Sequence, residues 1–121
     1  MGVCSAGAPA YALSFFAGRS VAMERAGTMA DGMACRVPVE EALETILNGA
    51  SRVVTATDAE VPVAMRAFFS ETHNVAEGAG AASLAAALRE APANAGKRIA
   101  LVLSGGNVDR STFAEVLAGR D

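Results

Sequence analysis

Two short tracts hold the residues whose types and spacing could do chemistry. The first, Ser104-Gly105-Gly106-Asn107, follows an apolar run and precedes a helical pattern. Glycines at such a turn let the backbone approach a flat ligand closely, and a serine hydroxyl can donate to an aromatic nitrogen or accept from its proton. Taken alone, the tract is also typical of an ordinary loop between a strand and a helix.

Glu77 is the second candidate, because it stands among small residues just before Gly78-Ala79-Gly80. A buried carboxylate is costly unless it is hydrogen-bonded or has a function. The alternative is a glutamate at a helix N-terminus, where the helix dipole favours negative charge. The residues alone leave both interpretations open.

The remaining polar residues favour structural roles. His73 is the only histidine, and we interpret it as a helix-end or loop residue with a structural hydrogen bond in preference to a general base. Asp31 and Asp109 are typical of turn and cap residues. The only lysine, Lys97, precedes an apolar run and is expected at the surface.

The hydrophobic pattern predicts the elements that must position these tracts. Apolar periodicity, glycine stops and β-branched runs predict helices over residues 8–17, 39–48, about 59–72, 79–90 and 110–118, and strands over residues 2–4, 52–57 and 98–103. Asp58 is the expected N-cap of the third helix, and residues 19–38 are expected to form an excursion over the sheet edge. Strands alternating with helices indicate an α/β fold, three-layered with a mostly parallel sheet.

Composition excludes several classes of protein. The 121 residues are 52% hydrophobic and 19% charged with a net charge of -3, which argues against disorder and against a nucleic-acid partner. No apolar run reaches the roughly 20 residues that span a bilayer, and no signal peptide is evident. Cys4 and Cys35 are too few and too far apart for a disulfide framework or a zinc site, so we expect reduced thiols and a cytoplasmic location.

Three tracts resemble, in order and spacing, the threonine dehydratase and serine racemase branch of the fold type II pyridoxal-phosphate (PLP) enzymes. They are Thr-Met-Ala-Asp-Gly at 28–32, Thr-His-Asn-Val-Ala-Glu-Gly-Ala-Gly-Ala-Ala at 72–82 and Val-Leu-Ser-Gly-Gly-Asn-Val-Asp at 102–109. The resemblance covers essentially the whole chain. It implies that Ser104 hydrogen-bonds the pyridine nitrogen of PLP and that Glu77 lies near the ring. It also implies that Gly105, Gly106 and Asn107 form the turn behind the ring, and that Gly32 lines the pocket with its backbone.

The sequence also departs from the family pattern. Relatives hold PLP as a Schiff base on a lysine in an early Ser-Phe-Lys type motif and cradle its phosphate in a run of glycines, and neither motif occurs in this sequence. No catalytic residue is therefore assigned. Cys4 and Ala10 stand where some relatives have carboxylates for a divalent cation, so no metal is expected. We expect residues 1–121 to form a single partial domain, the C-terminal part of the PLP-binding catalytic domain, without a regulatory domain.

The leading hypothesis is a truncated or split piece of a PLP-dependent ammonia-lyase, which converts threonine or serine to a 2-oxo acid and ammonia. By itself the chain is expected to bind no PLP and to be inactive. A second hypothesis is a stand-alone, non-catalytic domain for oligomerisation or ligand binding, whose exposed sheet edge pairs with a second copy. A third is one half of a split enzyme, completed by a separately encoded N-terminal half.

Overall fold

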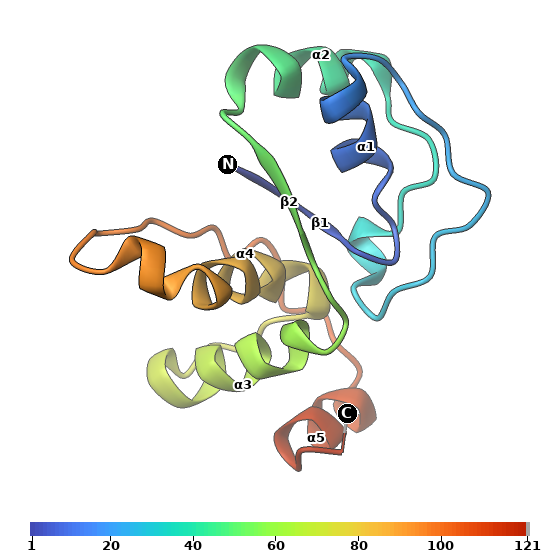
Figure 1. The fold of residues 1–121 in the computed structure, drawn as a ribbon. Helices are drawn as coiled ribbons and strands as arrows, with labels where there is room; N and C mark the ends of the chain where they lie inside the picture. Colours follow the sequence, from blue (N-terminus) through green and yellow to red (C-terminus); the bar gives the residue numbers. More distant parts are fainter. Residues whose placement is uncertain (121) are drawn as a thin grey trace. The chain divides into compact units, whose positions relative to one another are not determined.

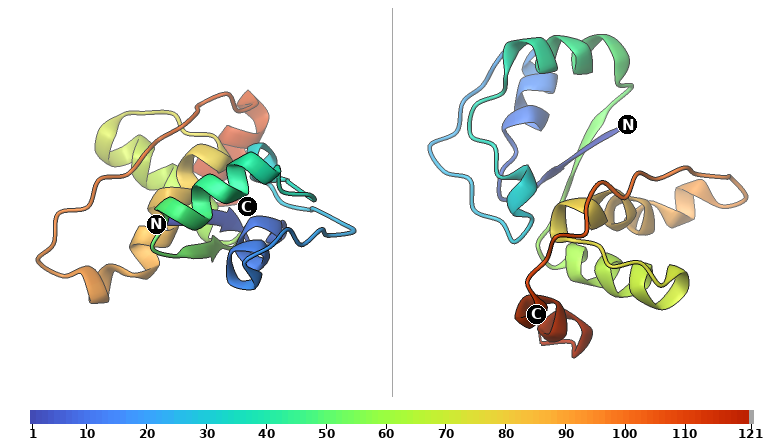
Figure 2. Two further views of the ribbon diagram at one scale, coloured as in Figure 1. Left: turned by 90° about the horizontal axis from the view of Figure 1, so that it is seen from above. Right: turned by 180° about the vertical axis from the view of Figure 1, so that it is seen from behind.

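The computed structural model describes residues 1–120, which form two compact units, Met1–Asp58 (unit 1) and the residues from Ala59 onward (unit 2). Figures 1 and 2 show the helices and strands of each unit, coloured along the chain. Each unit is described by itself below. Mixed α/β structure was predicted from the sequence, and the structure confirms it.

Unit 1 is built on a parallel pair of strands, β1 (Gly2–Ser5) and β2 (Val53–Ala56), with Gly2 opposite Val53 and Ser5 opposite Ala56. The connection between them carries α1 (Ala10–Ala17), the 3-10 turn η1 (Asp31–Met33) and α2 (Glu40–Gly49). Both strands and both α-helices were predicted. The buried centre joins β1, α1 and β2 through Cys4, Ala12 and Val53.

The boundaries of these helices have simple causes. Helix α1 ends because Gly18 adopts a left-handed conformation with φ of 64°, which glycine adopts at little cost. Helix α2 turns Leu43 inward and keeps its glutamates exposed, as the apolar stripe predicts.

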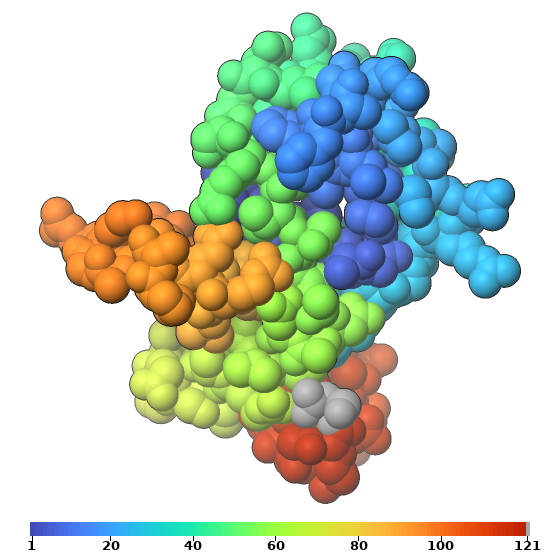
Figure 3. Space-filling model, viewed as in Figure 1, coloured from blue at the N-terminus to red at the C-terminus, as the bar shows by residue number. Residues whose placement is uncertain are grey.

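Unit 2 is helical in its described residues and contains α3 (Glu60–Thr72), α4 (Gly78–Arg89), the 3-10 turn η2 (Ala91–Asn94) and α5 (Arg110–Leu117). Helices α3 and α4 pack closely because α4 buries only glycines and alanines. Phe69 and Phe113 join α3 to α5 with ring centroids 5.6 Å apart. Figure 3 shows the orange residues around η2 standing out from the other helices of the unit.

Two predictions about these elements were wrong. Residues 98–103 form no strand, because a strand exists only through bonds to a neighbouring strand and the described part of unit 2 offers none. Asp58 does not cap α3, whose N-cap is Ala59. Its carboxylate instead accepts hydrogen bonds from the Thr28 hydroxyl and from the Met29 amide, the latter at 3.1 Å. Across residues 1–120, no helix is long and apolar enough to cross a membrane.

Candidate functional site

The structure brings the two chemistry-bearing tracts of unit 2 into direct contact. The amide of Glu77 donates to the Gly105 carbonyl oxygen at 3.0 Å, so the start of α4 is bonded to the turn after Ser104. A Cβ atom on Gly105 would overlap the Glu77 carboxylate, and one on Gly106 would lie 2.6 Å from the Val75 carbonyl oxygen. Gly106 is therefore required for this approach because it faces backbone, whereas Gly105 faces the movable end of the Glu77 side chain.

Ser104 presents its side chain outward at this contact. The residue is exposed, and its hydroxyl has no hydrogen-bond partner within residues 1–120. Asn107, two residues beyond the glycine pair, is also exposed. A hydroxyl that the surrounding protein leaves free, beside a backbone without side chains, can pair with a polar atom at the edge of a flat ligand.

Glu77 combines features of both interpretations that the sequence left open. It occupies the N-cap position of α4 and is half-buried, yet its carboxylate makes no capping hydrogen bond with the helix. The carboxylate lies against Gly105 instead. The position benefits from the positive end of the helix dipole, and the oxygens remain available to another partner. Its role near a cofactor stays a prediction.

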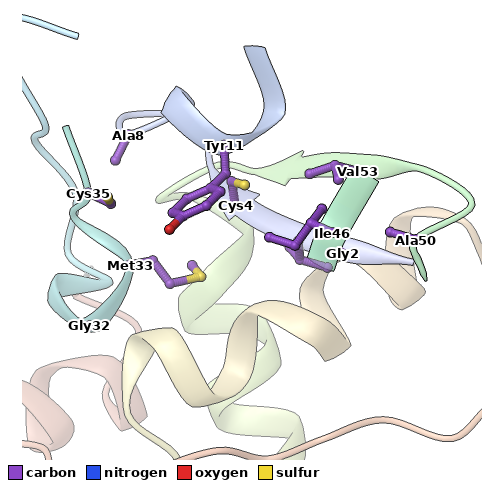
Figure 4. A pocket seen from close by; sticks show the side chains of 11 residues that line it. Gly2, Cys4, Ala8, Tyr11, Gly32, Met33, Cys35, Ile46, Ala50 and Val53 are labelled. Atoms are coloured by element: carbon purple, nitrogen blue, oxygen red, sulfur yellow. The ribbon is translucent and has the colours of Figure 1, made fainter. Parts of the chain in front are cut away.

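Gly32 belongs to unit 1, where it is part of η1 and is exposed. It lines an apolar cavity of about 280 Å³, together with residues of β1, α1, α2 and β2. Figure 4 shows Tyr11 of α1 and Met33 of η1 beside this cavity, with both cysteines also on its wall. No pattern in the sequence indicates this cavity, because its lining comes from residues that are distant in the chain.

The thiol of Cys4, on the wall of this cavity, has a perturbed acidity. Burial raises its pKa, a backbone hydrogen bond at Ala12 opposes this, and the electrostatic interaction with Cys35 raises it further. Both cysteines are free. At neutral pH Cys4 is therefore a protonated, inert packing residue.

The residues to which the sequence analysis assigned structural or surface positions lie where they were expected. His73 ends α3 with a positive φ of 58°, and its Nδ1 lies 3.3 Å from the Phe69 carbonyl oxygen. Lys97 is exposed and donates to the Ala93 carbonyl oxygen at 3.0 Å. Asp109 occupies the N-cap of α5, although its side chain makes no capping bond. No group of three metal-binding side chains occurs among residues 1–120.

The contacts of two residues outside the predicted tracts were missed. Asp58 holds the tract that leads to Gly32, and Ser83 of α4 donates to the Val102 carbonyl oxygen at 2.9 Å. The only sequence signal for Ser83 was a hydroxyl in an alanine-rich helix. Asp58 was interpreted as a helix cap, so its contact with Thr28 and Met29 was not predicted.

Comparison with known proteins identifies relatives for nearly the whole chain. An L-threonine ammonia-lyase of Thermotoga maritima is 33% identical over 97% of this chain, and a β-hydroxyaspartate dehydratase of Paracoccus denitrificans is 37% identical over 79%. The solved structure of the processed threonine deaminase isoform 2 of Solanum lycopersicum covers 99% of this chain with a TM-score of 0.88 and 28% identity.

The chain spans only a part of these proteins: 29% of the T. maritima lyase, 30% of the P. denitrificans dehydratase and 34% of the S. lycopersicum chain. The family model for pyridoxal-phosphate dependent enzymes matches residues 1–105. That match includes the tracts around Gly32 and Glu77 and reaches Ser104, as the motif resemblance predicted. This chain therefore belongs to the family of pyridoxal-phosphate dependent enzymes.

Proposed function

We propose that this chain supplies one wall of the cofactor-ring pocket in an ammonia-lyase that acts on β-hydroxy amino acids. The observation that carries the proposal is the contact between Glu77 and Gly105, directly beside the free hydroxyl of Ser104. Two tracts whose order along the chain resembles that of the family meet there. Because the chain spans 29% of its lyase relative, the complete activity depends on further polypeptide that carries the remaining site residues.

In this proposal, the protein groups set the electronic character of the cofactor ring. Bound PLP supplies an electron sink for the α-carbon of the substrate. The Ser104 hydroxyl would pair with the ring nitrogen, and a neutral hydroxyl would not stabilise a proton there as a carboxylate does. The sink is then milder, which suits β-elimination because the departing hydroxyl takes up the developing charge. Gly105 and Gly106 let this turn lie directly against Glu77 and Val75, which keeps the Ser104 hydroxyl beside the Glu77 carboxylate.

The proposed substrate class is supported by the chemistry that the names of the relatives share. One is a threonine ammonia-lyase and another a β-hydroxyaspartate dehydratase, so both names describe an α-amino acid with a hydroxyl on the β-carbon. We propose threonine or serine as the substrate and a 2-oxo acid and ammonia as the products. A cytoplasmic location belongs to the same proposal and is supported by the two free cysteines.

By itself the chain is proposed to be inactive. The Nζ of Lys97 bonds to the Ala93 carbonyl oxygen on the exposed surface next to η2, and Lys97 is the only lysine in the sequence. A lyase of this family needs a lysine that can attack the cofactor aldehyde and move a proton at the substrate α-carbon. A second polypeptide with that lysine and a phosphate-binding loop would complete the site.

The proposal is tested by reconstitution. The purified chain is mixed with the N-terminal part of a threonine ammonia-lyase that contains the lysine, in the presence of PLP, and ammonia release from threonine and serine is followed. We expect release only from the mixture. In the mixture, Ser104→Ala should lower the rate by about tenfold, as expected for one hydrogen bond to a charged or polarised partner. Ser104→Thr, which keeps the hydroxyl, should retain more activity.

Ser111→Ala serves as the control, because Ser111 is an exposed serine in the first turn of α5. Borohydride reduction of the chain with PLP alone should give no specific labelling of Lys97. Specific labelling of Lys97 together with ammonia release from the chain alone would overturn the inactivity. A mixture that stays inactive while the chain associates with itself would favour the non-catalytic oligomerisation domain.

A further inference from the structure

We infer that Ser83 is a positioning residue, which holds the Ser104 segment on α4 at the spacing the cofactor pocket needs. The contact of Ser83 with the segment is observed in the structure. Only the effect of this contact on the cofactor pocket rests on the proposed function. The Ser83 hydroxyl donates to the Val102 carbonyl oxygen at 2.9 Å. The family pattern of the two tracts does not assign Ser83 a role.

The Ser83 bond is one of two that bracket Ser104. On the other side of Ser104, the Glu77 amide donates to the Gly105 carbonyl oxygen at 3.0 Å. At 1.5 Å per residue, the helix advances about 9 Å from Glu77 to Ser83. An extended chain at about 3.3 Å per residue covers about 10 Å from Gly105 back to Val102. The two spans agree, so the segment runs antiparallel to α4 and both bonds form without strain.

The segment depends on these bonds because other support is scarce. Residues 98–103 have no strand partner in the described part of unit 2, and Val102 is 75% exposed. In Figure 2 the segment passes along α4 as an extended ribbon between η2 and α5. An extended segment without ladder bonds samples many conformations unless specific contacts hold it. The hydroxyl of Ser83 restricts the conformation of the segment at Val102, two residues before Ser104.

The surface of α4 is shaped for this approach. Gly80 lies between the two anchors, and its missing side chain makes room for the Gly105 backbone. Ser83 is half-buried, and it is the only hydroxyl residue in a helix that otherwise consists of glycine, alanine, leucine and arginine. A longer side chain would hold the segment away from the helix, and alanine would offer no donor.

The test measures the order of the segment directly, in the full chain, by NMR. Ser83→Ala removes the donor while raising helix propensity, so any loosening of the segment does not come from a weaker helix. We expect amide hydrogen exchange at Glu77 to become about fivefold faster, the factor that corresponds to one ordinary hydrogen bond. Backbone order parameters from Leu103 to Asn107 should fall. Exchange within the later turns of α4 should not change.

Matched variants make the result specific. Ser83→Thr keeps the hydroxyl and should restore slow exchange at Glu77. Ser70→Ala, on the exposed side of α3, removes a helix serine elsewhere and should leave the segment as it is. Wild-type exchange and order parameters in Ser83→Ala would overturn the inference, because the bond would then position nothing.

A second measurement separates this inference from the proposed function. In the reconstituted assembly, Ser83→Ala should weaken PLP affinity in the same direction as Ser104→Ala, but less. If Ser104→Ala leaves affinity and rate unchanged while Ser83→Ala still loosens the segment, the proposed function fails and the positioning role stands. If Ser104→Ala weakens PLP binding and Ser83→Ala changes neither order nor affinity, the proposed function stands and this inference fails.

Discussion

Gly80 lies against Gly105 so closely that a Cβ atom on Gly80 would overlap the Gly105 carbonyl oxygen. The backbone of one tract thus occupies the space where a side chain of the other would stand. Helix α4 offers a surface without side chains at this point, and the turn after Ser104 uses it. Both tracts were recognised from the sequence as candidates for chemistry, and their contact explains why position 80 is a glycine.

Gly80→Ala should destabilise the protein, although alanine is normally the better helix former. In an open helix the exchange of glycine for alanine stabilises by about 0.5–1 kcal/mol. Here the Gly105 backbone must move, and we expect a net loss of about 1–3 kcal/mol. Denaturant unfolding followed by circular dichroism measures it. Gly49→Ala, whose Cβ would meet nothing within 4 Å, should be neutral or stabilising. Equal behaviour of the two variants would contradict the prediction.

A second close approach lies in unit 1, between Gly7 and Gly27. The Gly27 amide donates to the Gly7 carbonyl oxygen at 3.0 Å, and a Cβ atom on Gly7 would overlap the Gly27 carbonyl oxygen. Gly7→Ala should therefore cost about 1–3 kcal/mol of unfolding free energy. Gly27→Ala is the matched control, because its Cβ would meet nothing within 4 Å. The difference in unfolding free energy between the two variants tests the prediction. A smaller loss for Gly7→Ala than for Gly27→Ala would refute it.

Much of the fold was predictable because local signals agreed with the final packing. The stripe that includes Leu43 and the glycine at the end of α1 each determined an element without long-range information. The strand predicted over residues 98–103 was wrong for a physical reason. An apolar run shows that a segment can be buried, whereas a strand also needs a partner for its backbone groups.

The candidate site was predictable only in part. Neighbouring residues and the motif resemblance predict Glu77 and Ser104 as candidates, but no local pattern shows that a serine inside an alanine-rich helix bonds to Val102. Asp58 was misassigned because a carboxylate before a helix usually caps it, and its contact with Thr28 joins residues far apart in the chain. Long-range hydrogen bonds of this kind depend on the tertiary fold, which the single sequence does not display.

The Asp58 contact gives a further prediction. Its carboxylate accepts from the Thr28 hydroxyl and the Met29 amide, and the Ala30 amide donates to the Thr28 oxygen at 3.1 Å. Thr28→Val keeps the shape and removes the hydroxyl, so the carboxylate loses one donor and Ala30 loses its acceptor. We expect a loss of about 1–2 kcal/mol and faster amide exchange at Ala30.

Thr28→Ser retains the hydroxyl and should lose much less stability than Thr28→Val. Asp58→Ala should accelerate exchange at Met29 without shortening α3, because Ala59 and not Asp58 is the N-cap of that helix. Hydrogen exchange by NMR distinguishes the effects residue by residue. Fraying of the first turn of α3 in Asp58→Ala would show that the carboxylate acts as a helix cap after all.

Cys4 should give the protein a specific pH dependence. Burial raises the pKa of its thiol above the ordinary value of 9.0, so the unfolded chain releases the proton at lower pH than the folded one. Stability from this group is fully present below about pH 9 and is lost as pH rises from there through the folded-state pKa. In Cys4→Ala this part of the decline should disappear. Unfolding free energies of both proteins, measured from neutral to alkaline pH, should therefore converge at high pH, and parallel curves would exclude a raised thiol pKa.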